Sequence, residues 1–203
     1  MEIVVLADDG GYDFLQTLGE DITWIFTDRT NTFFENKDAA AYFDLRTNAS
    51  ADYSSIEKPV FINSMVPTLA ENNYSHNIIR INAWPGFIEK DLWEVAGVLS
   101  AEATDVLEKL YKKYIVVPDE SGFVSARIIA MIINEAYFAL NEEVSTKSDI
   151  DIAMKLGTNY PYGPFEWCDK IGVQQVYQLL AKLSLTDERF LPSAGIAAAN
   201  TNI

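Results

Sequence analysis

The side chains that most often carry acid–base chemistry are scarce in this sequence. His76 is the only histidine, and it ends a polar run that is typical of a loop before a strand. A general base must lie within hydrogen-bond reach of the proton that it removes, so a solvated loop histidine is the simpler interpretation. His76 by itself therefore gives no indication of imidazole catalysis.

Metal and nucleophile chemistry has little support either. Cys168 is the only cysteine, so the chain lacks both the Cys/His ligand spacing of a zinc site and the pair of thiols that a disulfide needs. Neither a G-x-S-x-G elbow nor a P-loop pattern occurs. Asp8, Asp9 and Glu20 are the nearest approach to a carboxylate cluster, and we interpret them as a solvated acidic turn. No metal site is predicted.

The charge of the chain limits its partners. Thirty acidic and fifteen basic side chains give a net charge of -15. Such a field repels phosphate backbones and anionic bilayers, so neither nucleic acid nor a membrane is an expected partner. The sequence contains no run near the roughly 20 apolar residues of a membrane span, and its start does not resemble a signal peptide. Together with the single cysteine, these features predict a cytoplasmic protein.

The elements that must position these residues begin with an α/β pattern. Apolar, β-branched runs predict strands at residues 2–7, 22–26, 41–45, 59–63, 77–83, 92–98 and 114–117. A turn at residues 8–11 and a helical spacing at residues 12–19 separate the first two strands. A longer helix is expected to begin at the N-cap Ser100 and to end at Lys112 and Lys113. This alternation predicts a small α/β sheet domain over residues 1–118.

Beyond Pro118 only helical patterns occur, and they predict a second domain over residues 119–203. Its helices are expected at residues 122–141, 146–157, 165–170 and 173–183, with Gly157 as a helix stop and a loosely held tail from Pro192. The helix at residues 122–141 has scarcely any polar face and must be buried on nearly every side. Two small domains can hardly enclose it, so we expect a homodimer formed through the C-terminal helices.

The C-terminal half carries a series of motifs in a fixed order. They are Ser121-Gly122-Phe123-Val124 with Arg127, Asn134-Glu135-Ala136, IDIAMKLG at 150–157, PYGPFE at 161–166, DKIG at 169–172 and DERF at 187–190. With these motifs, residues 121–193 resemble the all-helical dimerisation domain of the 3-hydroxyacyl-CoA dehydrogenase family. The resemblance implies a reduced Rossmann-like sheet domain followed by a C-terminal helical domain like that of 6-phosphogluconate dehydrogenase. In the family, the Rossmann domain holds NAD, and a His–Glu pair moves the proton that accompanies hydride transfer at the 3-carbon of the acyl-CoA.

The resemblance places the phosphate-binding pattern G-x-G-x-x-G at residues 7–12. Ala7, Asp9 and Tyr12 occupy its glycine positions. Glycine lets the backbone approach the pyrophosphate, whereas these side chains obstruct it and the carboxylates of Asp8 and Asp9 repel it. We therefore assign no cofactor, and NAD bound in the usual mode is the less favoured alternative.

The resemblance places the catalytic pair at Asn82 and Glu94, twelve residues apart. Asparagine has no titratable group near neutral pH, so Asn82 cannot be the general base, and Glu94 has no imidazole to orient. Ala126 replaces the asparagine of the Gly-Phe-x-x-Asn-Arg motif, and Ser64 is the hydroxyl nearest to the family's serine, one position out of register. These family-equivalent positions therefore do not amount to a catalytic site.

Three functions follow from these observations. The favoured one is a dimeric family member that is weakly active or non-catalytic. The second is an active NAD-dependent 3-hydroxyacyl-CoA dehydrogenase of fatty-acid metabolism, supported by Glu94 and the C-terminal motifs, acting alone or beside another subunit. The third is a protein that binds a small acyl ligand, such as an acyl-CoA, in an interdomain cleft without NAD. Binding of a nicotinamide cofactor distinguishes the first two, and stabilisation by an acyl ligand alone would indicate the third.

Overall fold

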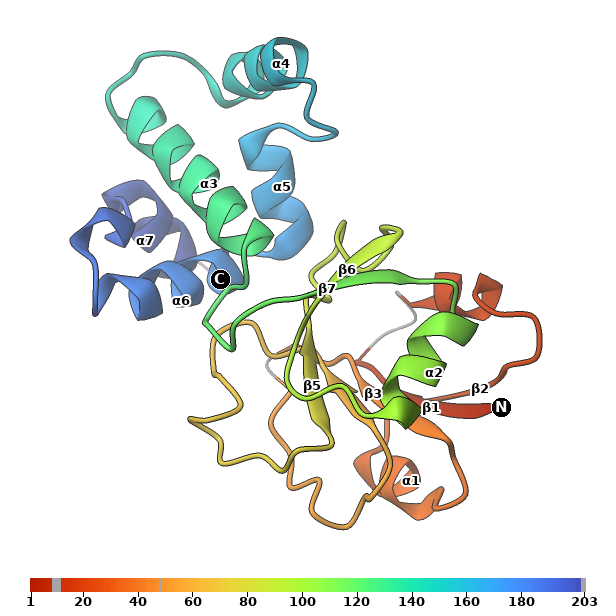
Figure 1. The fold of residues 1–203 in the computed structure, drawn as a ribbon. Coiled ribbons are helices and arrows are strands. Elements are labelled where there is room, and N and C mark those ends of the chain that lie inside the picture. Colours follow the sequence, from red (N-terminus) through yellow and green to blue (C-terminus); the bar gives the residue numbers. More distant parts are fainter. Residues whose placement is uncertain (9–11, 48, 202–203) are drawn as a thin grey trace. The chain divides into compact units, whose positions relative to one another are not determined.

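The computed structural model describes residues 1–8, 12–47 and 49–201 of the chain. They form two compact units, Met1–Phe123 and Val124–Ile203. The first unit is built around a sheet, and the described part of the second contains helices and no strand (Figure 1). A sheet domain followed by a helical domain was the predicted fold class, and it is confirmed.

The described residues of the first unit contain one seven-stranded sheet. Its strands are β1 Glu2–Leu6, β2 Thr23–Thr27, β3 Ala41–Asp44, β4 Val60–Ile62, β5 Ile78–Ile81, β6 Leu92–Ala96 and β7 Lys113–Val116. They lie in the order β2-β1-β3-β4-β5-β6-β7, and all neighbours are parallel except β5 and β6. The chain passes from β1 to β2 on one side and then to β3 on the other, which is the strand reversal of a Rossmann-like sheet.

A hydrophobic core covers each face of the sheet. Successive side chains of each strand point to opposite faces and therefore enter different cores. Ile3 and Val5 of β1 belong to one core, which also contains side chains of the helix α2, Ala101–Lys109. Val4 and Leu6 belong to the other core, which includes Phe33 of the helix α1, Thr30–Glu35. The apolar, β-branched composition that predicted these strands is therefore the composition of a sheet covered on both sides.

The connections between the strands differ from the prediction. Helical spacing at residues 12–19 suggested a full helix, but the structure has only the short 3-10 helix η1, Asp13–Thr17. Conversely, α1 lies in a polar stretch where no helix was expected. Ser100 caps α2 as predicted, its Oγ accepting from the Ala103 N–H at 3.1 Å, but α2 ends at Lys109 because Lys113 already pairs in β7. Within the described residues, loops without a helix connect β3 to β4 and β4 to β5.

The second unit is a helical array around α3. Its elements are α3 Ser125–Asn141, α4 Lys147–Thr158, α5 Pro164–Ile171, α6 Val173–Ser184, the 3-10 helix η2 Glu188–Phe190 and α7 Ala194–Thr201. The helix α3 packs against α5, α6 and α7. Across the ranges that the structure describes, none of the helices combines the length and apolar character of a membrane span.

Two expectations for the second unit are wrong. Gly157 lies inside α4, and the helix ends instead at Asn159, whose φ of 56° gives the left-handed cap that asparagine tolerates. The tail from Pro192 is not loose, since α7 is helical and Ile196 is fully buried. The Asn134 side chain of α3 holds it: Oδ1 accepts from the Ser193 N–H at 2.8 Å, and Nδ2 donates to the Leu191 carbonyl at 2.9 Å.

Replacing Asn134 by alanine should therefore destabilise the second unit. The substitution leaves the buried N–H of Ser193 without an acceptor, at a cost of about 1–3 kcal/mol. Urea unfolding followed by circular dichroism measures the loss. Thr201→Ala is the control, because the Thr201 hydroxyl donates to the Ala198 carbonyl within its own helix. Equal stability of N134A and the unmodified protein would show that this amide does not secure the tail.

Candidate functional site

The carboxyl edge of the parallel strands is the place to look for a site. In open parallel sheets, ligands bind beyond the carboxyl ends of the strands where the strand order reverses, here between β1 and β3. Ala7 and Asp8 follow β1, Leu45 follows β3 and Asn63 follows β4. Ala7, the first of the positions that the sequence singled out for the cofactor, therefore lies at this edge.

The described residues that follow β1 depart from the pattern of a phosphate-binding loop and helix. Ala7 continues the pairing with β2, its N–H donating to the Thr27 carbonyl at 3.1 Å. Tyr12 donates its phenol O–H to the carbonyl of Leu45 at 2.9 Å, so its side chain crosses from the end of β1 to the end of β3. The element that follows is the 3-10 helix η1, which lacks the aligned N–H groups of a long α-helix N-terminus. Asp9 lies outside the described residues.

A cluster of charged and polar side chains occupies the end of β3. The Asp44 carboxylate is fully buried. It accepts from Arg46 through Nε at 2.9 Å and Nη2 at 2.6 Å, and from the Tyr53 hydroxyl at 2.8 Å. The remaining Arg46 nitrogen, Nη1, donates to Thr30 Oγ1 at 3.3 Å. Burial and the neighbouring Asp44 carboxylate raise the pKa of Tyr53, which keeps the hydroxyl protonated as a donor. The sequence analysis missed this cluster, although Asp-x-Arg at the end of a strand is a detectable signal.

The family-equivalent catalytic positions do meet in the structure. Asn82 and Glu94 lie opposite each other where β5 and β6 are antiparallel, and the Asn82 N–H donates to the Glu94 carbonyl at 3.2 Å. Asn82 Nδ2 donates to Glu94 Oε2 at 3.0 Å, and both residues are buried. The twelve-residue spacing therefore identified a real pair of side chains. Chemically, the pair joins an amide donor to a carboxylate and contains no imidazole.

The burial and hydrogen bonds of the other predicted positions are as follows. Ser64 is fully buried and donates its hydroxyl to the Pro67 carbonyl at 2.9 Å, within its own loop. Ala126 is fully buried in α3. His76 is exposed in a turn before β5, as expected. Asn63 is different: it is 4% exposed, and its Oδ1 has no hydrogen-bond partner in the structure. A ligand N–H or O–H would satisfy this atom.

One acidic residue at the same edge escaped the sequence analysis. Asp28 is exposed and directly follows β2. Dinucleotide-binding sheets carry an acidic residue about 20 residues after the glycine loop, where it binds the ribose 2′-hydroxyl. The signal was an aspartate two residues after the second predicted strand.

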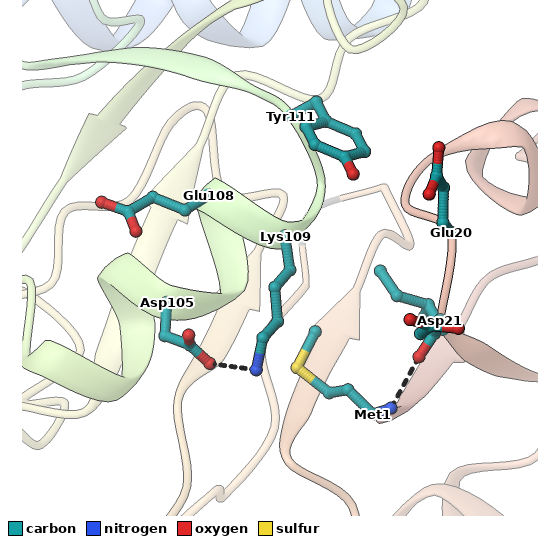
Figure 2. A pocket seen from close by; sticks show the side chains of 8 residues that line it. Met1, Glu20, Asp21, Asp105, Glu108, Lys109 and Tyr111 are labelled. Carbon is teal, nitrogen blue, oxygen red and sulfur yellow. Dashed lines mark hydrogen bonds and ion pairs between the residues drawn. The ribbon is translucent and has the colours of Figure 1, made fainter.

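A separate hollow of the sheet unit lies where β2 begins and α2 ends (Figure 2). Its volume is about 500 Å³, and its lining includes Glu20, Asp21, Asp105, Glu108 and Lys109. Lys109 pairs with Asp105 at 2.7 Å, so carboxylates dominate the lining and an anionic ligand is disfavoured. Glu20 precedes β2 and lies at its amino end, whereas Asp8 follows β1 and lies at the carboxyl edge. Among the described residues, no three or more His, Cys, Asp or Glu side chains are arranged to hold a metal ion.

Comparisons with known proteins agree on one family. Residues 122–195 match the model of the 3-hydroxyacyl-CoA dehydrogenase C-terminal domain. The 3-hydroxyadipyl-CoA dehydrogenase of Escherichia coli K12 is 42% identical over 88 residues, which are 42% of this chain and 18% of that protein. A probable 3-hydroxybutyryl-CoA dehydrogenase of Bacillus subtilis 168 is 36% identical over 105 residues, 48% of this chain and 37% of that protein. The matches thus span well under half of either relative.

The solved structures extend the likeness to the fold of the chain. The (S)-3-hydroxybutyryl-CoA dehydrogenase from Ralstonia eutropha aligns with a TM-score of 0.68 over 89% of this chain and 70% of that chain. The sequence identity is 21%, so this likeness concerns the fold. It agrees with a Rossmann-like sheet followed by a C-terminal helical domain.

The Asp44 cluster predicts a measurable cost for losing one donor. Tyr53→Phe removes a hydrogen bond to a buried carboxylate and should lower the free energy of unfolding by about 1.5–3 kcal/mol. Tyr111→Phe is the matched control, because Tyr111 is 69% exposed. Chemical denaturation of both variants checks the prediction. A Y53F variant as stable as Y111F would mean that the Tyr53 hydroxyl adds nothing to the pairing of Asp44.

Proposed function

We propose that this chain, whose residues 122–195 match the C-terminal domain of the 3-hydroxyacyl-CoA dehydrogenase family, is a dimeric family member that has lost the redox step and acts by binding. The observation that carries this proposal is Asn82, which the sequence resemblance places at the position of the general base and which donates to Glu94 at 3.0 Å. An amide does not take up a proton near neutral pH, so the substrate hydroxyl has no imidazole to receive its proton. Loss of a positioned base typically costs 10²–10⁴ in rate.

The cofactor side of the edge supports the same proposal. The Tyr12 phenol, bonded to the Leu45 carbonyl, crosses the region between β1 and β3 where a dinucleotide would approach the backbone. The guanidinium of Arg46 is already paired with Asp44 and is not directed to a phosphate. The net charge of -15 adds a field that opposes polyanionic cofactors.

An active NAD-dependent 3-hydroxyacyl-CoA dehydrogenase of fatty-acid metabolism is the second candidate. Asp28 at the end of β2 and the retained Glu94 favour it, as do the activities named for the relatives. A third candidate is a protein that binds an acyl-CoA-like ligand without NAD. Asn63 Oδ1 favours this role, since a ligand amide or hydroxyl would give this buried acceptor a donor.

We also propose that the second unit forms a homodimer. Large apolar side chains of α3 and α4 are exposed in the single chain: Ile128 at 52%, Ile152 at 49% and Leu156 at 83%. A second copy that covers them would remove this apolar area from water. The resemblance of residues 121–193 to the family's dimerisation domain supports the same arrangement.

The reducing cytoplasm is the compartment that we propose. Cys168 is buried, and burial raises the pKa of its thiol, so it is protected from oxidation. A single cysteine cannot form an intrachain disulfide, so an oxidising compartment would not stabilise the chain in that way.

Cofactor binding is the first test of the proposed function. A ligand at 100 times its Kd stabilises a protein by about 2.7 kcal/mol. Because the proposed protein has lost its cofactor site, NADH at high concentration should leave its thermal unfolding midpoint unchanged. Acetoacetyl-CoA in a parallel sample tests the acyl ligand alone.

The Asn82→His variant sharpens this test, because it restores an imidazole beside Glu94. We expect it to remain unable to oxidise NADH with acetoacetyl-CoA, since the cofactor site is lost as well. Turnover by N82H, or an NADH-dependent rise of the unfolding midpoint in the unmodified protein, would contradict the loss of the cofactor site and favour the dehydrogenase.

Sedimentation equilibrium tests the dimer. The chain should sediment at about twice its 22.8 kDa mass. Ile128→Glu places a charge on the exposed face of α3 and should weaken the association at least tenfold, about 1.4 kcal/mol. Val98→Glu, at a 64% exposed position of the sheet unit, is the control and should leave the dimer intact. A monomeric unmodified protein would refute the proposal.

A further inference from the structure

Arg80 is a fully buried arginine on the sheet strand β5. Its Nε donates to the Ser64 carbonyl at 2.8 Å, and its Nη1 pairs with Asp119 Oδ1 at 2.6 Å and donates to the Glu120 carbonyl at 3.2 Å. The guanidinium carbon also lies 4.7 Å from the centre of the Phe123 ring. A guanidinium withdrawn from water costs several kcal/mol unless its N–H groups are paired. Burial of Arg80 therefore depends on its partners in residues 119–123.

Asp119 holds a second part of the sheet unit. Besides pairing with Arg80, its carboxylate accepts from the N–H groups of Leu69 at 3.1 Å and Ala70 at 3.2 Å. These residues belong to the loop that follows β4. Ser121 donates its hydroxyl to the Val66 carbonyl at 2.7 Å, and the Gly122 N–H donates to the Met65 carbonyl at 2.6 Å. Three residues of the segment that leads to α3 therefore form hydrogen bonds with this one loop.

We propose that Arg80 clamps residues 119–123 onto the sheet unit, so that the linker to the helical unit begins beyond Phe123 and not at Pro118. Sequence composition changes at Pro118, which makes it the natural place to expect a linker. The clamp restricts the conformational freedom of the residues that follow Pro118. Asp119, Glu120, Ser121 and Gly122 each form a hydrogen bond with Arg80 or with the loop after β4.

The clamp also connects the segment to the candidate site. Arg80 binds the carbonyl of Ser64, the residue next to Asn63, and Asn82 lies two residues further along the same chain segment. Arg80 is therefore a positioning residue for the β4 side of the carboxyl edge as well as for the segment that enters α3. This inference concerns the sheet unit alone and does not require the proposed loss of the redox step.

Hydrogen exchange on the full chain tests the clamp. The amides of Leu69, Ala70 and Gly122 should be protected in the unmodified protein. Asp119→Asn weakens the acceptor for two of them and the ion pair with Arg80, and Arg80→Met removes the guanidinium. In both variants the protection factors of these three amides should fall at least tenfold. The protection factors of the Val5 and Phe43 amides in the sheet core should stay unchanged.

Proteolysis gives a second measure of the same segment. A glutamate-specific protease should spare Glu120 in the unmodified protein and cut there in both variants. Asp52→Asn is the matched control, since Asp52 is an exposed carboxylate that accepts from the Ser54 N–H at 2.9 Å in another loop. If Arg80→Met fails to fold, Asp119→Asn decides. Unprotected amides at Leu69, Ala70 and Gly122 in the unmodified protein, or unchanged protection in Asp119→Asn, would overturn the clamp.

Discussion

Parallel pairing of β1 with β2 on one side and β3 on the other is the constraint on which the sheet unit depends. Parallel strands need long return connections that cover the sheet, and both faces of this sheet are buried accordingly. The pairing also brings the carboxyl ends of β1, β3, β4 and β5 to one edge. Tyr12, Asp44, Asn63 and Asn82 come together there because the strand register fixes where each strand ends.

The polar groups at this edge are satisfied largely by each other. The Tyr12 hydroxyl bonds to a backbone carbonyl at the end of β3, the Asp44 carboxylate is neutralised by Arg46, and Asn82 donates to Glu94. A buried carboxylate without such partners would be costly, so this internal pairing stabilises the edge with protein groups. A dinucleotide site needs donors directed toward the phosphates instead. This internal pairing is the structural basis of the proposed loss of the redox step.

In the helical unit, the family motifs act through packing. A Cβ added to Gly163 would lie 2.3 Å from Asp151 Oδ1, so only glycine fits beside that carboxylate. Asp151 in turn accepts from the Phe165 N–H at 2.8 Å at the start of α5. These residues identify the domain because they join α4 to α5, and such contacts persist whether or not a reaction takes place elsewhere. Family membership and activity are therefore separate questions for this chain.

Local patterns by themselves determined the strands, most of the helices, the cap at Ser100 and the twelve-residue spacing that pairs Asn82 with Glu94. Each of these follows from side-chain periodicity, from a hydrogen bond to a residue three positions away, or from the motif spacing of a family. Only the tertiary structure decided that the tail is an ordered helix and that Arg80 is buried. Those outcomes depend on partners 57 or 59 residues away for Asn134 and 39 for Arg80. A sequence pattern does not reveal such partners, because the fold alone brings them within hydrogen-bond distance.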